Sequence, residues 1–108
     1  MTLTPVCPLA DLDEGRPVAV TVAGTPVVLV RRGDDVHALL DRCSHAEVPL
    51  SQGEVTGGGL ECWLHGACFD LRTGEPSGPP ASEPVPVYAV EVRDGHVHVA
   101  TEAVGSTD

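Results

Sequence analysis

The stretch that decides the fold runs from residue 43 to residue 70 and reads "CSHAEVPLSQGEVTGGGLECWLHGACFD". It contains two short motifs, Cys43-x-His45 and Cys62-x-x-His65, which residues 46–61 separate. Each motif supplies one thiol and one imidazole, and these side chains bind transition metals. The stretch is therefore the candidate metal-binding part of the chain.

Three interpretations compete for these two motifs. Two Cys and two His suit a structural zinc site, although zinc fingers usually place both Cys on one element and both His on the other. A [2Fe–2S] cluster in which two His replace two Cys on one iron explains why each motif mixes the two residue types. Thiols and histidines without a metal suit Cys7 and Cys68, since a free Cys is often a small buried hydrophobe, but explain the paired spacing poorly.

Both flanks of this stretch read as antiparallel β-structure. Residues 18–40 alternate apolar with small or polar side chains around turn residues, and residues 85–100 do the same on either side of Asp94-Gly95. Between the flanks, residues 42–80 are rich in Gly, Pro and Ser and show no regular period. So long an irregular segment is unusual in a compact domain, and a metal centre would organise it.

These patterns predict an all-β fold in one domain, which is the usual size for 108 residues. We expect the base of the domain to comprise about residues 1–41 and 81–108. The metal-binding subdomain, about residues 42–80, is inserted between these two parts.

The charge and the ends of the chain limit the possible partners. The formal net charge is −10, and phosphate binding needs clustered Lys and Arg, so we expect no nucleic acid. An acidic surface suits docking to a basic protein surface, or solubility alone. The first residues lack a basic start followed by a long apolar run, and no window resembles a membrane span. We therefore expect a cytoplasmic protein with free thiols.

The sequence resembles the Rieske-type [2Fe–2S] ferredoxins of bacterial ring-hydroxylating (aromatic) dioxygenase systems. That family has the C-x-H and C-x-x-H motifs at this separation, and "HAEVPLSQGEV" and "HGACFDLRTGEP" are similar to its two loops. The resemblance covers nearly the whole chain. It implies the Rieske fold, an antiparallel β-sandwich or barrel base with an inserted loop-rich cluster-binding subdomain, and one Rieske [2Fe–2S] cluster as cofactor.

The resemblance also implies the ligands of the cluster. Cys43 and Cys62 would bind the inner iron, and His45 and His65 would bind the outer, more exposed iron. After the second motif, Thr73-Gly74 would turn the chain, and Asp70 would order that turn rather than do chemistry. The sequence leaves open the roles of three further residues, Cys7, Trp63 and Cys68.

Departures from the high-potential respiratory relatives indicate a low potential. Those relatives carry a disulfide between the loops, at the positions of Val48 and Leu64 here. They also have two hydroxyl groups that bond to cluster sulfurs, at the positions of Ala67 and Phe69. Because such hydrogen bonds raise the potential, their loss predicts a value toward the low end of the Rieske range, about −150 mV.

The function implied by the resemblance is electron transfer in aromatic hydrocarbon catabolism, not catalysis. A monomeric carrier would take one electron from an NAD(P)H-dependent flavoprotein ferredoxin reductase and pass it to a terminal non-haem iron oxygenase. The alternatives are a small Rieske subunit of another redox enzyme, such as an assimilatory nitrite reductase, and a zinc-bound structural module. The sequence does not identify the oxygenase, its substrate or the reductase.

Three further histidines lie on the predicted strands. His37 reads as a surface strand residue. His96 and His98 lie two apart, so they share one face of a strand, and with an acid they form the beginning of a mononuclear iron site. We favour the simpler interpretation of a hairpin that faces solvent.

Overall fold

The computed structural model describes residues 3–42, 48–57, 59–62, 68–76 and 84–104, with the backbone alone for 102–104. Within these ranges the regular structure is β-strand apart from two short 3-10 turns, η1 and η2, so the predicted all-β class is confirmed. No helix in the described part of the chain is long and apolar enough to span a membrane. The elements are β1 (Thr4–Pro8), η1 (Leu9–Asp11), β2 (Val18–Val22), β3 (Thr25–Arg32), β4 (Asp35–Leu40), η2 (Leu50–Gln52), β5 (Glu54–Thr56), β6 (Gly59–Glu61), β7 (Cys68–Asp70), β8 (Val87–Arg93) and β9 (His96–Val104).

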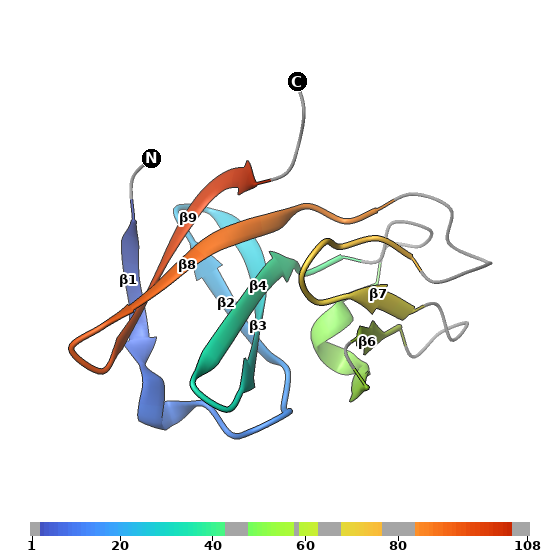
Figure 1. The fold of residues 1–108 in the computed structure, drawn as a ribbon. Coiled ribbons are helices and arrows are strands. Elements are labelled where there is room, and N and C mark those ends of the chain that lie inside the picture. Colours follow the sequence, from blue (N-terminus) through green and yellow to red (C-terminus); the bar gives the residue numbers. More distant parts are fainter. Residues whose placement is uncertain (1–2, 43–47, 58, 63–67, 77–83, 105–108) are drawn as a thin grey trace.

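One large antiparallel sheet contains both flanks of the chain. Its strand order is β1-β9-β8-β4-β3-β2, and every neighbouring pair is antiparallel. The two edge strands, β1 and β2, also contact each other, so the sheet curls into a barrel-like shape (Figure 1). Such curling protects the strand edges from pairing with other chains. The expected antiparallel, barrel-like β-fold is therefore confirmed.

Tight turns with positive φ connect two hairpins of the large sheet. Ala23-Gly24 joins β2 to β3 with φ values of 50° and 82°, and Asp94-Gly95 joins β8 to β9 with 53° and 76°. Two central residues with positive φ define the type I′ turn, whose twist matches that of the flanking strands. The predicted hairpins at both positions are confirmed.

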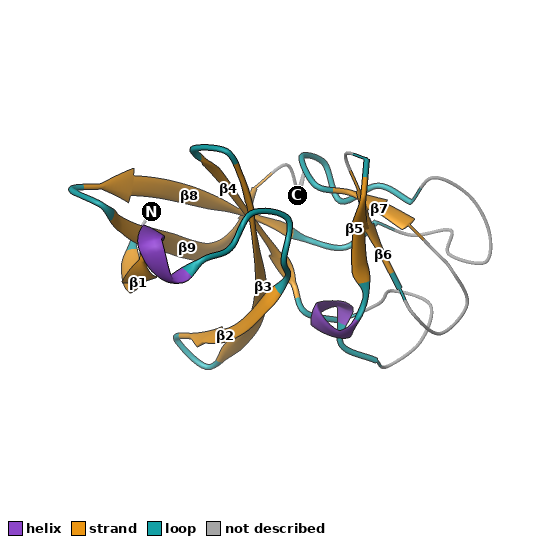
Figure 2. Ribbon diagram, turned by 90° about the horizontal axis from the view of Figure 1, so that it is seen from below, coloured by secondary structure: helices purple, strands orange, loops and turns teal. Residues whose placement is uncertain are grey.

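A second, smaller sheet has the order β5-β6-β7 and lies to one side of the large sheet (Figures 1 and 2). Leu60 pairs with Val55 on one side and with Phe69 on the other, so these three apolar side chains share one face. This sheet and η2 fall within the predicted insertion 42–80, whereas the strands of the large sheet fall outside it. The division into a base and a subdomain, and its boundaries, stay predictions.

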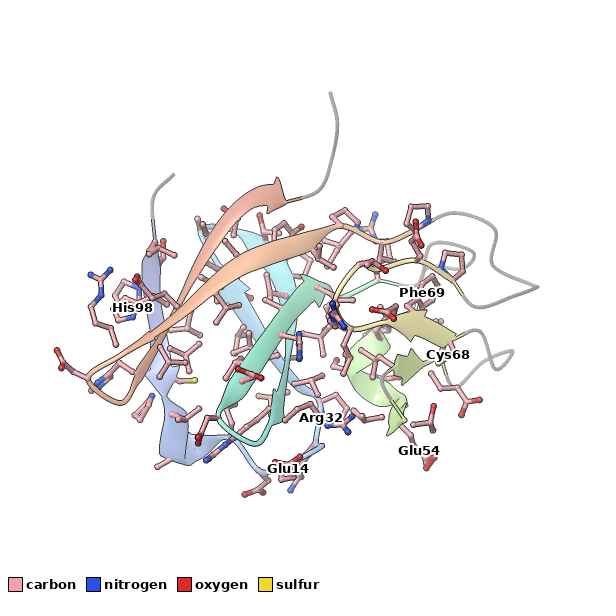
Figure 3. All side chains as sticks on the ribbon, in the orientation of Figure 1. Glu14, Arg32, Glu54, Cys68, Phe69 and His98 are labelled. Carbon is pink, nitrogen blue, oxygen red and sulfur yellow. The ribbon has the colours of Figure 1, made fainter. Side chains whose placement is uncertain are left out.

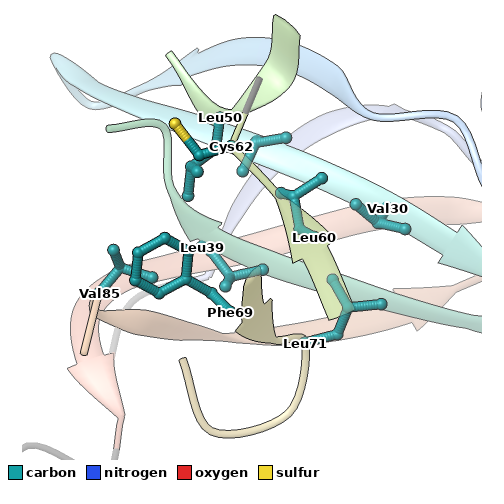
Figure 4. Close-up of a cluster of buried hydrophobic side chains, with 9 residues drawn as sticks. Val30, Leu39, Leu50, Leu60, Cys62, Phe69, Leu71 and Val85 are labelled. Atoms are coloured by element: carbon teal, nitrogen blue, oxygen red, sulfur yellow. The ribbon is translucent and has the colours of Figure 1, made fainter. Parts of the chain in front are cut away.

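Two hydrophobic cores share strand β3, whose residues Val27 to Val30 are all fully buried. Because side chains alternate along a strand, Val27 and Leu29 enter one core, and Val28 and Val30 enter the other. The barrel core consists of Leu12, Val22, Val27, Leu29, Val36, Ala38, Val97 and Val99. The interface core, between β3 and β4 and the small sheet, consists of Val28, Val30, Leu39, Leu50, Leu60, Cys62, Phe69, Leu71 and Val85 (Figure 4).

Candidate metal centre

Cys62 is the only predicted ligand that lies within the described residues. It follows β6 directly, and its exposed fraction is 0%, since it belongs to the interface core and lies beside Leu50 (Figure 4). The other three, Cys43, His45 and His65, lie outside the described residues. In the ranges that are described, no three His, Cys, Asp or Glu side chains gather into a metal site. The set of four ligands therefore stays a prediction.

The Asp41 side chain connects the two segments of the chain that flank the first motif. Asp41, two residues before Cys43, donates its N–H to the carbonyl of Pro26 over 3.0 Å. The Asp41 carboxylate accepts a hydrogen bond from the Ser51 N–H at 2.7 Å and another from the Ser51 hydroxyl at 2.8 Å. This pair has no signature in the sequence, because an acid before a loop and a serine after it are not by themselves a motif.

The chain on either side of the second motif is held by backbone pairing. Strand β6 pairs with β7, and the last pair before the motif joins Glu61 to Cys68. Gly53, which directly precedes β5, lies very close to β6 on its other side, because a Cβ atom at Gly53 would lie 1.8 Å from the carbonyl oxygen of Glu61. At Gly59 a Cβ atom would lie 2.5 Å from the Cys68 sulfur. Small residues therefore let the strands and the thiol pack closely here.

Asp70 orders the turn that follows β7, as predicted. The Asp70 Oδ1 atom accepts hydrogen bonds from the N–H groups of Arg72 at 2.7 Å and Thr73 at 3.1 Å. These bonds, the one from Arg72 above all, lower the pKa of the Asp70 carboxyl. Gly74 completes the turn with φ 77°, and its carbonyl accepts the N–H of Val85 at 2.9 Å. The expectation that Asp70 and Thr73-Gly74 form this turn is confirmed.

Two further cysteines, Cys7 and Cys68, are not among the predicted ligands. Cys68 is half-buried on β7, and its sulfur lies 3.7 Å from the Thr56 hydroxyl (Figure 3). Cys7 is half-buried on β1, where burial and then the nearby Asp11 carboxylate raise the pKa of its thiol. Both are packed on strands, which agrees with the interpretation of small, buried-type cysteines.

The positions that set this chain apart from high-potential relatives are partly described. Phe69 is fully buried in the interface core, and Val48 packs against that core. Trp63, Leu64 and Ala67 lie outside the described residues. At position 69, where the high-potential relatives have a hydroxyl group, this chain therefore has a buried phenyl ring without one.

His37 is more buried than the sequence analysis expected. It is half-buried on β4, on the same face as Leu39, because the small sheet covers this face of the large one. Burial lowers the pKa of His37, and the surrounding charges act in both directions. Asp35 and Asp70 favour the protonated form, and Arg32 and Arg72 oppose it. The prediction of a surface residue is therefore correct only in part, because the small sheet covers this face of β4.

His96 and His98 lie on β9 as expected. His96 is exposed and His98 is half-buried. Their Nδ1 atoms lie 3.3 Å from the Asp94 carbonyl oxygen and 3.2 Å from the His96 carbonyl oxygen, respectively. These local backbone contacts suit the ordinary hairpin that was favoured for them.

Comparison with known proteins agrees with this fold and with the motifs. Residues 2–89 match the Rieske [2Fe-2S] domain family. The chain is 41% identical to the anthranilate 1,2-dioxygenase ferredoxin subunit of Burkholderia cepacia, over 91% of this chain and 94% of that protein. It is 40% identical to the solved ferredoxin of carbazole 1,9a-dioxygenase from Nocardioides aromaticivorans IC177, with a TM-score of 0.88 over 93% of this chain and 98% of the other.

A third similar structure is a complex of reduced oxygenase and oxidized ferredoxin in carbazole 1,9a-dioxygenase. The matched chain has 35% identity and a TM-score of 0.89, over 96% of this chain and 97% of that one. The relatives are named as ferredoxins, which are electron-transfer components and not catalytic subunits. The chain therefore belongs to the Rieske [2Fe–2S] domain family, as a ferredoxin whose cofactor is one Rieske [2Fe–2S] cluster.

Proposed function

We propose that this ferredoxin is a low-potential one-electron carrier of a ring-hydroxylating oxygenase system. It takes electrons from an NAD(P)H-dependent flavoprotein reductase and passes them to a terminal non-haem iron oxygenase. The observation that carries the proposal is its overlap, along nearly the whole chain, with a chain from the complex of oxygenase and ferredoxin. The dioxygenase ferredoxin subunits among its relatives support the same role.

The proposed ligands are Cys43 and Cys62 for one iron and His45 and His65 for the other. Two thiolates and two neutral imidazoles are the donor set of a Rieske cluster, and such a cluster supplies a reversible one-electron redox change. Cys62 fits this role, since it lies at the start of the second loop in an apolar core that excludes water. Its burial among Leu and Val side chains fixes the position of the thiol.

The same core supports a low potential. Hydroxyl groups that donate to cluster sulfurs stabilise the reduced form and raise the potential. Phe69 offers no hydroxyl and is fully buried, and Ala67 also has none. We expect a midpoint potential of about −150 mV in a redox titration. A midpoint well above about 0 mV would contradict this part of the proposal.

The acidic surface supports docking to basic partners. The net charge is −10, and complementary charges speed the encounter of two proteins, whereas salt screens them. Electron-transfer complexes are also typically small and short-lived. We expect the second-order rate of electron transfer with reductase and oxygenase to fall as ionic strength rises. A rate that does not change with salt would remove the electrostatic part of the proposal.

The decisive experiment is anaerobic purification, followed by assays of iron and acid-labile sulfide and an EPR spectrum of the reduced protein. We expect two irons and two sulfides per chain and a red-brown colour. A colourless protein with one zinc would refute the proposal and support the structural module. Reduction by NAD(P)H plus a reductase, and reoxidation by an oxygenase, then test the direction of transfer.

The ligand assignment has its own test. His65→Ala should abolish the cluster, because one iron would lose half of its protein ligands. His98→Ala is the matched control, since His98 lies on β9 of the large sheet. A full, unchanged cluster in the His65 variant would show that the assignment is wrong.

The proposal also covers the organisation and the location of the chain. We propose a cytoplasmic monomer with a base of about residues 1–41 and 81–108 and a cluster-binding subdomain of about 42–80. Light scattering of the holoprotein tests the monomer. Cell fractionation tests the location, and a protein found in the membrane fraction would contradict it.

A further inference from the structure

The two proposed ligand loops are closed at their ends in different ways. The second loop is closed by the β6–β7 ladder, with Glu61 paired to Cys68. For the first loop, no backbone pair joins the two ends among the described residues. Its ends are joined instead by the Asp41 carboxylate, which accepts both the N–H and the hydroxyl of Ser51.

Each side of this Asp41–Ser51 contact is anchored in the fold. Asp41 donates its N–H to the carbonyl of Pro26 on β3, so it is fixed to the large sheet. Ser51 belongs to η2, whose Leu50 is fully buried in the interface core. The two hydrogen bonds are short, at 2.7 and 2.8 Å, and part-buried. Bonds to a carboxylate in such a setting are among the strong hydrogen bonds of proteins.

Between these anchors lie Cys43 and His45, half of the proposed ligands. A loop whose ends are fixed has less conformational freedom than one with a single fixed end. We propose that Asp41 is a positioning residue of the metal centre: by bonding both donors of Ser51, it sets the first ligand loop relative to Cys62. This inference rests on the proposed ligand assignment.

Two substitutions at Asp41 separate positioning from charge. Asp41→Asn and Asp41→Ala both remove one negative charge. The Asn side chain keeps an oxygen that accepts the Ser51 N–H and an amide that donates to the Ser51 hydroxyl. The Ala side chain removes both bonds. A positioning role therefore predicts a large difference between the two variants, whereas a pure charge effect predicts none.

The readouts are the EPR spectrum of the reduced holoprotein and the rate at which iron is released to a chelator. With Asp41→Ala we expect shifted g values and iron release at least about tenfold faster than in the wild type, because strong bonds to a charged group are lost. Asp41→Asn should keep the wild-type g values and stay within about threefold in rate. Equal behaviour of the two variants, or an Asp41→Ala variant identical to the wild type, would overturn the inference.

Asp34 is the matched control, because it is exposed and precedes β4, whereas Asp41 follows that strand. Asp34→Asn and Asp34→Ala remove the same charge at the other end of β4 and should leave both readouts unchanged. If Asp41→Ala does not fold, Ser51 decides the question with the charge intact. Ser51→Ala removes the hydroxyl bond and keeps the backbone one. Altered g values in Ser51→Ala that Ser51→Thr restores would support the inference, and wild-type g values in Ser51→Ala would overturn the role of the hydroxyl bond in it.

Failure of the ligand assignment gives a different result. His45→Ala should lose the cluster whether or not Asp41 positions the loop. A His45→Ala protein with an unchanged iron content and EPR spectrum would refute the assignment. Wild-type behaviour of the Asp41 variants, together with cluster loss in His45→Ala, would refute only the positioning role.

Discussion

The barrel core and the interface core are built on the same strand but in different ways. The barrel core gathers residues from regular alternating strands that pair as hairpins. The interface core gathers one or two residues from each of several short pieces, including η2, β6, β7 and the segment at Val85. The strands around the barrel core therefore follow from local patterns, whereas the interface core depends on where separate short segments meet β3 and β4.

Because the two cores are built differently, we expect them to unfold separately. Among the variants, Phe69→Ala should have the largest effect on stability. Removing this buried ring should cost about 3–5 kcal/mol. The loss falls on the small sheet, so heating should bleach the visible absorbance of the cluster before the far-UV circular dichroism of the barrel changes. Leu29→Ala is the counterpart in the barrel core, at about 2–5 kcal/mol, and should lower both signals together. Coincident transitions in both variants would mean that the two cores behave as one unit.

Two glycines extend the comparison to the turns. Gly74, beside the interface core, and Gly95, in the barrel hairpin, both have positive φ, at 77° and 76°. A Cβ atom at Gly74 would lie 2.1 Å from the Val85 carbonyl oxygen, whereas one at Gly95 would meet nothing within 4 Å. Gly95→Ala should cost about 1–2 kcal/mol from backbone strain. Gly74→Ala should cost about 1–3 kcal/mol more from the close contact, measured as a difference in unfolding free energy. Equal costs would show that the contact relaxes freely.

The seam between the two sheets should show a pH dependence through His37. Its pKa is lowered in the folded protein by burial, so the unfolded chain binds the proton more readily. The stability contribution is therefore present above pH 6.5, the ordinary histidine value, and is lost as the pH falls below it. The Tm of the wild type should fall more steeply through this range than that of His37→Gln. His96→Gln, on the exposed hairpin, is the control, and parallel Tm profiles for wild type and His37→Gln would refute the effect.

The smallest expected effect concerns a contact between β3 and the small sheet. Arg32 donates to the carbonyl of Gly57 in the β5–β6 turn, and its Nε atom lies 3.6 Å from a carboxylate oxygen of Glu14 (Figure 3). Both side chains are substantially exposed, so Arg32→Ala should cost less than about 1 kcal/mol in a denaturant titration. Arg16→Ala, which loses an even more exposed pair with Asp13, should cost nothing measurable. A cost of several kcal/mol for Arg32→Ala would mean that this contact holds the sheets together.

The sequence was sufficient to predict the hairpins of the large sheet, because their signals are local, whereas the barrel-like shape was implied by the family resemblance. Alternating Val residues and the Asp94-Gly95 turn act over a few positions, and the strands form where they indicate. The burial of His37 is a property that such local patterns do not predict. Alternation correctly puts it on one face of β4, but a second sheet, absent from any local pattern, covers that face. Covering a strand is a tertiary event that a period-two pattern does not encode.

Part of the candidate site could likewise be predicted from local sequence patterns, and part could not. The spacing of the Cys and His motifs indicates a metal site, and the family resemblance implies the ligand set. Of that set, Cys62 lies in the buried interface core. The Asp41–Ser51 contact was missed, because its two residues stand on opposite sides of a loop and neither type is diagnostic there. Metal-binding residues can be recognised in a sequence by their type and spacing, whereas residues that position a loop are recognised only from the contacts they make in the structure.

The absence of buried polar or charged side chains among the described residues has a consequence for the speed of electron transfer. When the charge of a buried redox centre changes, polar groups and water nearby must reorient, and this rearrangement slows the reaction. Around Cys62 the described neighbours are aliphatic side chains and one aromatic ring, all closely packed. These side chains carry no dipoles that must reorient when the charge nearby changes. If Cys62 binds the cluster as proposed, the described side chains around its thiol therefore need to move little as the electron arrives and leaves.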